Sequence, residues 1–225
     1  MGKEVRIRDR IDLSPRFVES DAIRLNNMFR GRDTSEMLES VLRDGLAGDV
    51  GLVSSFGAES AVLLHLVASV DKSVPVLFLD TGKHFDETLA YRDRLAERLN
   101  LNLVNLMPDP ADLAARDENG LRWSFDPDGC CDLRKVRPLA RAMTRFDATI
   151  TGRKGFQSAT RRGLPRFEID KSDAEGRLKI NPLADWDADR IAAYFEEHDL
   201  PRHTLVAQGY PSIGCAPCTN KVKPG

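Results

Sequence analysis

The sequence lacks the features of a membrane protein, a secreted protein or a general nucleic-acid binder. No apolar run reaches the ~18 residues of a transmembrane helix. The first dozen residues are mixed in charge and contain no apolar signal-peptide core. Neither sign of charge is in excess, since 33 Lys and Arg face 35 Asp and Glu. We therefore expect neither nucleic acid nor a membrane as a partner.

Cysteine is scarce, and its four copies form two tight pairs, Cys130 with Cys131 and Cys215 with Cys218. Each pair lies on a short stretch of backbone, which we call a cysteine arc. Two such arcs brought together make a four-sulfur site, which suits zinc or an iron–sulfur cluster. Structural zinc sites usually separate their cysteines by about two to four residues, so the adjacent pair favours a cluster. The alternatives are two disulfides, which require an oxidising compartment, or four unrelated buried thiols. Reduced, paired cysteines without a targeting segment indicate the cytoplasm.

Short apolar strands alternate with helices along most of the chain, a pattern typical of an α/β domain with a mostly parallel sheet. We expect strands at 49–54, 74–80, 102–107 and 148–151, and a hairpin over 166–180. Residues 34–225 are predicted to form this domain. Residues 1–33 are interpreted as an N-terminal arm, partly helical around 17–29.

Two of the expected strands run into candidate anion-binding loops. The first loop, residues 54–60, is rich in Ser and Gly and precedes an apolar helix, so its backbone N–H groups can receive an anion. It is not the Gly-Lys-Ser/Thr phosphate loop, because it contains no Lys. The second, residues 152–162, carries Arg153, Lys154, Arg161 and Arg162. The alternatives are an ordinary turn with capping serines and a solvated loop.

Three histidines were considered as ligands or bases. His84 follows the strand at 74–80 and is interpreted as a residue at the start of the next helix. For His198 and His203 we expect exposure to solvent. The segment 201–211 is expected to be an irregular link to the second cysteine pair.

Several motifs occur together in a fixed order: Ser54-Ser55-Phe56-Gly57-Ala58-Glu59-Ser60; Leu79-Asp80-Thr81-Gly82 with Phe85 and Glu87-Thr88; Cys130-Cys131 with Arg134-Lys135-Val136 and Pro138-Leu139; Gly152-Arg153-Lys154, Gln157-Ser158 and Thr160-Arg161; Asn181-Pro182-Leu183; and Cys215-Ala216-Pro217-Cys218-Thr219. This combination resembles the phosphoadenylyl-sulfate/adenylyl-sulfate reductases of assimilatory sulfate reduction. These enzymes fall within the adenine-nucleotide α-hydrolase-like (pyrophosphate-loop) group, and the resemblance covers about residues 45–225.

The resemblance implies reduction of adenosine 5′-phosphosulfate to sulfite and AMP, with thioredoxin as the electron donor. The paired cysteines resemble the subgroup that carries a [4Fe-4S] cluster, here on Cys130, Cys131, Cys215 and Cys218. Relatives that reduce the 3′-phosphorylated substrate commonly lack these pairs. Relatives are also commonly homo-oligomers, so a homo-oligomer is compatible with the resemblance.

The resemblance also assigns roles to single residues. The loop with Ser54, Ser55, Gly57, Glu59 and Ser60 holds the phosphosulfate. The adenosine side is lined by Leu79, Asp80, Thr81 and Gly82. The residues that close over the nucleotide are Gly152, Arg153, Gln157 and Arg161, with Arg162 as a substitute if the loop is shifted. Lys135 is expected between cluster and substrate as a catalytic residue.

The sequence departs from this family in one respect. The family's nucleophile is a cysteine in a C-terminal Glu-Cys-Gly-x-His-type tail, whereas this chain stops at Lys223-Pro224-Gly225. We therefore expect that the last few dozen residues are missing, and that the 225 residues bind cluster and nucleotide without turnover. The alternatives are phosphoadenylyl-sulfate reductase activity, a pyrophosphate-loop sulfur-transfer enzyme, and a metal-stapled nucleotide-binding or redox-sensing module.

Overall fold

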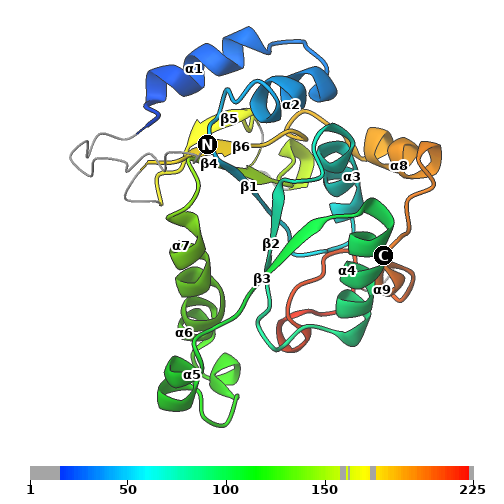
Figure 1. The fold of residues 1–225 in the computed structure, drawn as a ribbon. Coiled ribbons are helices and arrows are strands. Elements are labelled where there is room, and N and C mark those ends of the chain that lie inside the picture. The colour runs from blue at the N-terminus through cyan, green and yellow to red at the C-terminus, as the bar shows by residue number, and fades with distance from the viewer. Residues whose placement is uncertain (1–15, 158–160, 162, 173–175, 223–225) are drawn as a thin grey trace, which may run out of the picture.

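The computed structural model describes residues 16–157, 161, 163–172 and 176–222. Within these residues one six-stranded sheet has the order β3-β2-β1-β4-β6-β5 (Figure 1). Neighbouring strands pair in parallel except β5 and β6, which are antiparallel. The strands are β1 (Val50–Val53), β2 (Pro75–Leu79), β3 (Asn102–Leu106), β4 (Ala148–Thr151), β5 (Phe167–Ile169) and β6 (Leu178–Ile180).

The central strands form because their side chains are apolar on both faces of the sheet. Leu52, Phe78 and Ile150 are fully buried, as expected for parallel strands covered by helices on both sides. The strands predicted from the sequence and the hairpin over 166–180 are confirmed, and the mostly parallel α/β fold is confirmed with them.

Helices cover the sheet from two sides. In Figure 1, α3 and α4 lie on one side of β1 and β2, and a column of α5, α6 and α7 lies on the other. The helices are α1 (Glu19–Met28), α2 (Thr34–Leu42), α3 (Ser60–Val70), α4 (Asp86–Leu99), α5 (Pro110–Arg116), α6 (Pro127–Cys131), α7 (Arg137–Met143), α8 (Ala188–Glu197) and α9 (Thr204–Ala207). Among the described residues, none of the helices combines the length and apolarity needed to cross a bilayer.

Helix α1 covers the edge of the sheet at β5. Its Leu25 is fully buried in the same core as the strands. The side chain of Asn26 takes the place of a further strand, because its amide donates to the Phe167 carbonyl (2.7 Å) and its oxygen accepts from the Phe167 N–H (3.1 Å). The predicted boundary between the arm (1–33) and the domain (34–225) therefore separates α1 from the sheet edge that it covers.

Helix α2 is capped by Asp33, whose carboxylate accepts from the Ser35 N–H (2.7 Å). Thr34 points inward, where its hydroxyl accepts from the indole N–H of Trp186 (3.0 Å). The segment 201–211 is not irregular throughout, because it contains the short helix α9.

Replacing Asn26 by Ala should weaken the attachment of α1 to β5. Both backbone groups of Phe167 lose their partner, so the free energy of unfolding should fall by about 1–3 kcal/mol. Urea denaturation followed by circular dichroism measures the change. The matched control is Asn27→Ala, because the Asn27 side chain is exposed and contacts Arg30 of the same helix end (2.8 Å). Equal losses in the two variants would contradict the role of Asn26.

Candidate functional site

The strand order reverses between β1 and β4, and this reversal places the two predicted anion loops together. From β1 the chain continues to β2 and β3 on one side, while β4 pairs with the other side of β1. In open α/β sheets, ligands bind outside the carboxyl ends of the strands at such a switch point. Residues 54–60 follow β1 and residues 152–161 follow β4, so both loops emerge there.

The first loop turns at Phe56, which has a left-handed backbone (φ 49°) although it carries a bulky side chain. Burial holds this strained conformation, since the ring is fully buried and packs edge-on against Phe78 with centroids 5.5 Å apart. The Ser54 hydroxyl accepts from the Phe56 N–H (3.2 Å). The loop therefore enters α3 with a fixed backbone.

The N-terminus of α3 is open toward this loop. No side chain caps it, and the Ser60 hydroxyl is directed back to the Gly57 carbonyl (2.8 Å). The first backbone N–H groups of an uncapped helix carry a partial positive charge. This end of α3 is therefore suited to receive an anion.

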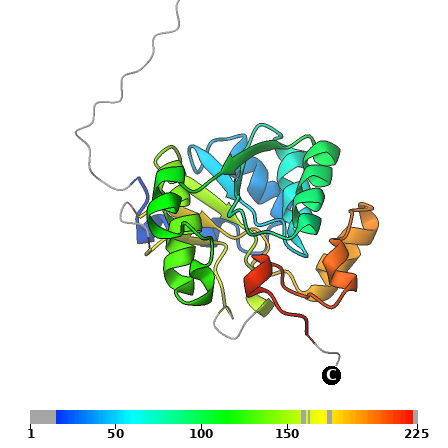
Figure 2. The same cartoon turned by 90° about the horizontal axis from the view of Figure 1, so that it is seen from below.

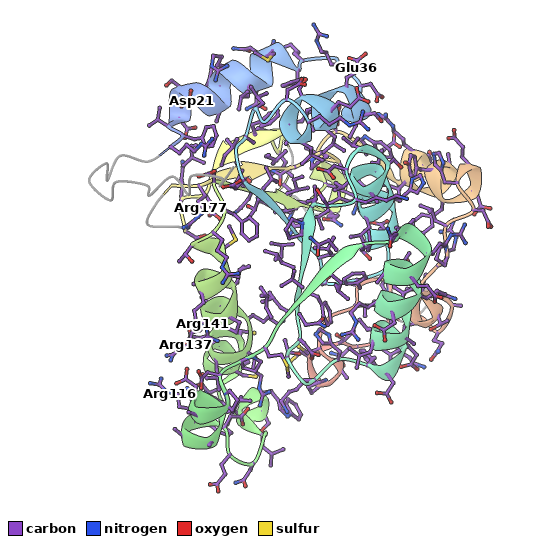
Figure 3. All side chains as sticks on the ribbon, viewed as in Figure 1. Asp21, Glu36, Arg116, Arg137, Arg141 and Arg177 are labelled. Atoms are coloured by element: carbon purple, nitrogen blue, oxygen red, sulfur yellow. The ribbon has the colours of Figure 1, made fainter. Side chains whose placement is uncertain are left out.

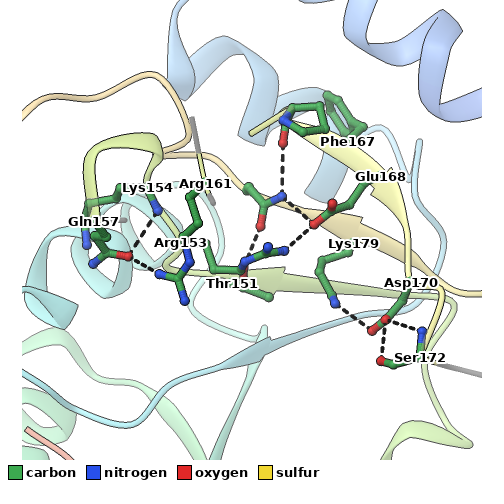
Figure 4. A network of polar contacts seen from close by, with 12 residues as sticks. Thr151, Arg153, Lys154, Gln157, Arg161, Phe167, Glu168, Asp170, Ser172 and Lys179 are labelled. Atoms are coloured by element: carbon green, nitrogen blue, oxygen red, sulfur yellow. Dashed lines mark hydrogen bonds and ion pairs between the residues drawn. The ribbon is translucent and has the colours of Figure 1, made fainter. Parts of the chain in front are cut away.

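The second loop supplies cations whose charges are already partly balanced. Lys154 is 3 % exposed, and its ammonium group contacts the Glu59 carboxylate (2.9 Å) and the Gly152 carbonyl (3.2 Å). Arg153 pairs with Glu168 on β5, and Arg161 donates to the side-chain oxygen of Gln157 (2.5 Å; Figure 4). Glu59 thus serves as the counter-ion of a buried lysine.

A short polar network holds the Glu168 carboxylate in place for Arg153. Asn181 donates to Glu168 (3.1 Å) and to the Pro165 carbonyl (3.0 Å), and it accepts from the Thr151 hydroxyl at the end of β4 (2.6 Å). The motif Asn181-Pro182-Leu183 therefore supports the second loop from behind.

The two loops and a third segment enclose a cavity of about 250 Å³. The third segment is 211–213, which directly precedes the second cysteine pair. The cavity is lined by residues 52–55, 57–60, 63, 64, 152–154, 157, 161, 183 and 211–213. It includes every residue assigned to substrate from the two loops: Ser54, Ser55, Gly57, Glu59, Ser60, Gly152, Arg153, Gln157 and Arg161.

The residues assigned to the adenosine side lie outside this lining. The Asp80 carboxylate is 3.8 Å from Arg92, and the Thr81 hydroxyl is 3.3 Å from the sulfur of Cys215. Lys135 does not line the cavity either. The roles of Leu79, Asp80, Thr81, Gly82 and Lys135 remain predictions. Arg162, Ser158 and Thr160 lie outside the described residues.

The first cysteine pair ends α6, where the helix widens. Residues Asp132–Val136 form a π-helical turn, in which the Arg137 N–H donates to the Asp132 carbonyl, five residues back. Pro138 follows in the first turn of α7, since proline lacks an N–H and would clash inside a regular helix. Such widened turns often mark functional sites.

The second cysteine pair lies in a 3-10 turn, Ala216–Cys218, which returns to the turn after β2. The Ala216 N–H donates to the Lys83 carbonyl (2.7 Å). Seen from below in Figure 2, this C-terminal segment (red) lies between the green helices α5–α7 and the orange helices α8 and α9.

All four thiols are free, with Cys130 and Cys215 buried and Cys131 and Cys218 exposed. Burial raises the pKa of Cys130, Arg134 opposes this shift, and the nearby Cys131 and Cys215 raise the pKa further. Arg134, three residues after Cys131, donates to the Thr81 carbonyl (2.7 Å), and the Thr81 hydroxyl lies 3.3 Å from the Cys215 sulfur. The same turn therefore contacts the segments of both cysteine pairs. No three His, Cys, Asp or Glu side chains among the described residues are arranged to hold a single metal ion. Four thiols in two pairs are the type of donor set that an iron–sulfur cluster takes.

The basic residues after the first pair differ in orientation. Arg134 is buried, whereas Arg137 lies on the outer side of the α5–α7 column with Arg116 and Arg141 (Figure 3). Arg137 contacts Asp132 (2.7 Å), and that hydrogen bond raises its pKa. Arg134 is therefore the better placed of the two to balance thiolate charge at Cys130.

A family model described as the phosphoadenosine phosphosulfate reductase domain matches residues 50–221, which include both loops and all four cysteines. The chain belongs to this family. It is 46 % identical over 92 % of its length to the adenosine 5′-phosphosulfate reductase of Mesorhizobium japonicum, and covers 81 % of that protein. It is 54 % identical to the Chelativorans sp. protein of the same name, over 79 % of this chain and 71 % of that protein.

Solved structures agree with the family assignment. The phosphoadenylyl-sulfate reductase from Candida auris has a TM-score of 0.76 and 27 % identity, covering 92 % of this chain and 100 % of that chain. The FMN adenylyltransferase from Candida glabrata has a TM-score of 0.55 and 15 % identity, over 88 % of this chain and 70 % of that chain. The latter similarity shows the fold alone, which is that of the adenine-nucleotide α-hydrolase-like group.

Sequence reasoning missed three parts of the candidate site. Lys154 was read as one of several loop cations, although it is the buried one. Leu183 and the segment 211–213 also line the cavity. For residues 211–213, the available signal in the sequence was that they end only two residues before Cys215.

The histidines of this reductase fold differ from expectation at one position. His84 precedes α4 as expected, and its Nε2–H donates to the Leu79 carbonyl (2.8 Å). His198 is half-buried, with its ring centroid 4.6 Å from that of His65 and 4.1 Å from that of Tyr194. The exposure expected for His203 is wrong. It is 1 % exposed, and its Nδ1 caps α9 by accepting from the Leu205 N–H (3.2 Å).

The stability of the fold should fall in mild acid because of His203. Burial lowers its pKa below the ordinary 6.5, and protonation of Nδ1 would break the cap of α9. Its contribution to stability is therefore complete above about pH 6.5 and is lost as the pH falls toward the folded pKa. Urea denaturation between pH 7.5 and 5.5 should show a loss of at most about 1.4 kcal/mol per pH unit from this residue.

His203→Asn is the informative variant, since asparagine can cap a helix but does not titrate. The variant should be less stable at neutral pH, because it loses the packing on Tyr91, and its stability should depend less on pH. A remaining slope is expected from His65, whose pKa is also lowered, chiefly by burial. A pH slope equal to that of the unaltered chain would exclude His203 as the titrating group.

Proposed function

We propose that this protein reduces adenosine 5′-phosphosulfate to sulfite and AMP in sulfate assimilation, with thioredoxin as the electron donor. One observation carries the proposal. The segment 211–213 lines the cavity between the two anion loops, and two residues later the same segment provides Cys215. A nucleotide site and a four-cysteine site are thus joined by one short stretch of backbone.

The cavity offers the groups that a phosphosulfate requires. The open N-terminus of α3 and the serines of residues 54–60 can bind one anionic group, and Arg153, Lys154 and Arg161 face the same space. When the bond between the sulfate sulfur and the bridging oxygen breaks, negative charge develops on the phosphate of AMP. Fixed cations and N–H donors stabilise that charge without having to reorganise.

We propose that Cys130, Cys131, Cys215 and Cys218 hold a [4Fe-4S] cluster. Two buried and two exposed free thiols in facing arcs provide its four thiolate ligands. When bound, the cluster adds a concentrated charge beside the cavity, and Lys135 is proposed to couple this charge to the substrate. A cytoplasmic location agrees with thiols that stay reduced.

The proposed reaction also needs a thiolate that is not a cluster ligand. Since all four cysteines are assigned to the cluster, we propose that this thiol lies outside the 225 residues. It attacks the sulfate sulfur, the S–O bond to phosphate breaks with both electrons going to AMP, and an enzyme thiosulfonate forms. The dithiol of thioredoxin then donates two electrons, releasing sulfite and ending as a disulfide.

Nucleotide titration of the 225-residue protein, prepared without oxygen, tests the substrate. Adenosine 5′-phosphosulfate should bind, and the 3′-phosphorylated form should bind more weakly. Preference for the 3′-phosphorylated form would overturn the proposed substrate. Release of pyrophosphate from ATP would instead indicate a sulfur-transfer enzyme that adenylates its substrate.

Arg161→Ala should weaken nucleotide binding by about 1.5–3 kcal/mol, because a charged hydrogen bond to the anion is lost. Calorimetric titration measures this change. Lys72→Ala is the matched control, since Lys72 is exposed in the turn before β2, at the opposite end of the strands. Unchanged affinity in Arg161→Ala would reassign the contact to Arg153 or Lys154.

Iron analysis tests the cluster separately. About four irons and four sulfides per chain, with broad visible absorption, are expected for the unaltered protein. Cys218→Ser should lose most of this iron. One zinc and no iron per chain would refute the cluster, and iron retained in full by Cys218→Ser would refute this ligand set.

A further inference from the structure

Arg134, which lies close to the first cysteine pair, forms a buried ion pair with Asp117, a residue that has no role in the site described above. The Asp117 side chain is 2 % exposed and that of Arg134 9 %. One carboxylate oxygen of Asp117 accepts from Nε (3.1 Å) and from a terminal nitrogen (2.5 Å) of Arg134. The other oxygen accepts from the Arg122 N–H (2.8 Å).

The remaining terminal nitrogen of Arg134 points to the turn that contacts the second cysteine pair. It donates to the Thr81 carbonyl (2.7 Å), and the Thr81 hydroxyl is 3.3 Å from the sulfur of Cys215. Two residues on, the Lys83 carbonyl accepts from the Ala216 N–H (2.7 Å). Arg134 itself follows Cys131 by three residues. Its guanidinium group therefore bridges the two cysteine arcs.

Asp117 is tied to the same turn by a second route. The Gly120 N–H donates to the Asp117 carbonyl (2.9 Å), and the Gly120 carbonyl accepts from the Lys83 ammonium group (2.5 Å). The loop that begins at Asp117 is thus fixed to Lys83 and to Arg134 together. Each polar group in this chain of contacts has a partner.

Stability alone is a poor explanation for this arrangement. A buried ion pair is often no more stabilising than apolar residues of similar size, whereas losing one partner leaves a costly unpaired charge. What the pair does provide is orientation, because a guanidinium group that donates in three fixed directions admits few geometries.

We infer that Asp117 is a positioning residue. It fixes the orientation of the Arg134 guanidinium group. Through Arg134 and the turn at Thr81 it holds the two cysteine arcs in fixed positions relative to each other. The inference rests on the proposed four-cysteine site. It concerns the relative positions of the two cysteine pairs, which thiol labelling can follow without a bound cluster.

Thiol labelling of the metal-free protein tests this geometry. In the unaltered chain, Cys215 is buried and should react with an alkylating agent more slowly than the exposed Cys218. Asp117→Ala should accelerate labelling of Cys215 at least about tenfold, although Asp117 is far from Cys215 in sequence. Asp117→Asn should have a smaller effect, since its amide oxygen can still accept from Arg134. If Asp117→Ala fails to fold, the labelling rate of Cys215 in Asp117→Asn tests the inference instead.

Two further variants separate positioning from charge and from general stability. Arg134→Lys keeps the positive charge but lacks the fork, so it should accelerate labelling as Asp117→Ala does. Asp170→Ala removes a half-buried ion pair with Lys179 (2.8 Å) at the far edge of the sheet and should leave the labelling of Cys215 unchanged. The inference would be overturned if Asp117→Ala or Arg134→Lys labelled Cys215 at the rate of the unaltered chain. It would also be overturned if Asp170→Ala accelerated the labelling of Cys215 as much as Asp117→Ala does.

The loaded protein gives an independent readout. With the cluster in place, Asp117→Ala should release iron to a chelator at least about tenfold faster than the unaltered protein, and Asp170→Ala should not. If the unaltered protein carries no iron when prepared without oxygen, the proposed cluster fails. The labelling of Cys215 still decides whether Asp117 holds the arcs.

Discussion

The candidate site depends on the pairing of β1 with β4. Because β1 continues to β2 on one side and pairs with β4 on the other, the loops that follow these two strands open toward the same space. The rest of the site is built on this reversal. Burial of Phe56 fixes the first loop in a strained turn, and the Asn181 network supports the second loop from the adjacent strand β6. A change in strand order would separate the loops even if every side chain remained.

The cavity is less positive than its cations suggest. Lys154 is neutralised by Glu59, and Arg153 is paired with Glu168. Burying several cations together without counter-ions would be costly, so the carboxylates make the empty site stable. An anionic ligand must then compete with these carboxylates for the same donors. Its affinity therefore depends on the open N-terminus of α3 and on Arg161 as well as on the paired cations.

The sequence predicted the strands and the loops well, because these depend on local patterns. Val76–Phe78 and Ile150 are apolar on both faces, and only a covered parallel sheet accommodates such runs. The shared metal site indicated by the paired cysteines stays a prediction. The left-handed backbone of Phe56 was not predictable, since nothing in its type favours that conformation. The burial of His203 was missed because it depends on contacts with distant residues such as Thr88.

Contacts over long sequence distances also explain why the sequence did not predict that the segment before Cys215 lines the cavity. The motifs give the order of the loops but not the path of residues 211–218, which depends on how Lys83 receives the Ala216 N–H. That hydrogen bond and the contact of the Thr81 hydroxyl with the Cys215 sulfur (3.3 Å) hold the second cysteine pair near the end of β2. Pro211, Ser212 and Ile213 are then carried to the cavity by the same backbone. Ligand binding and the cysteine arcs therefore share one structural element, and a displacement of that element would affect both.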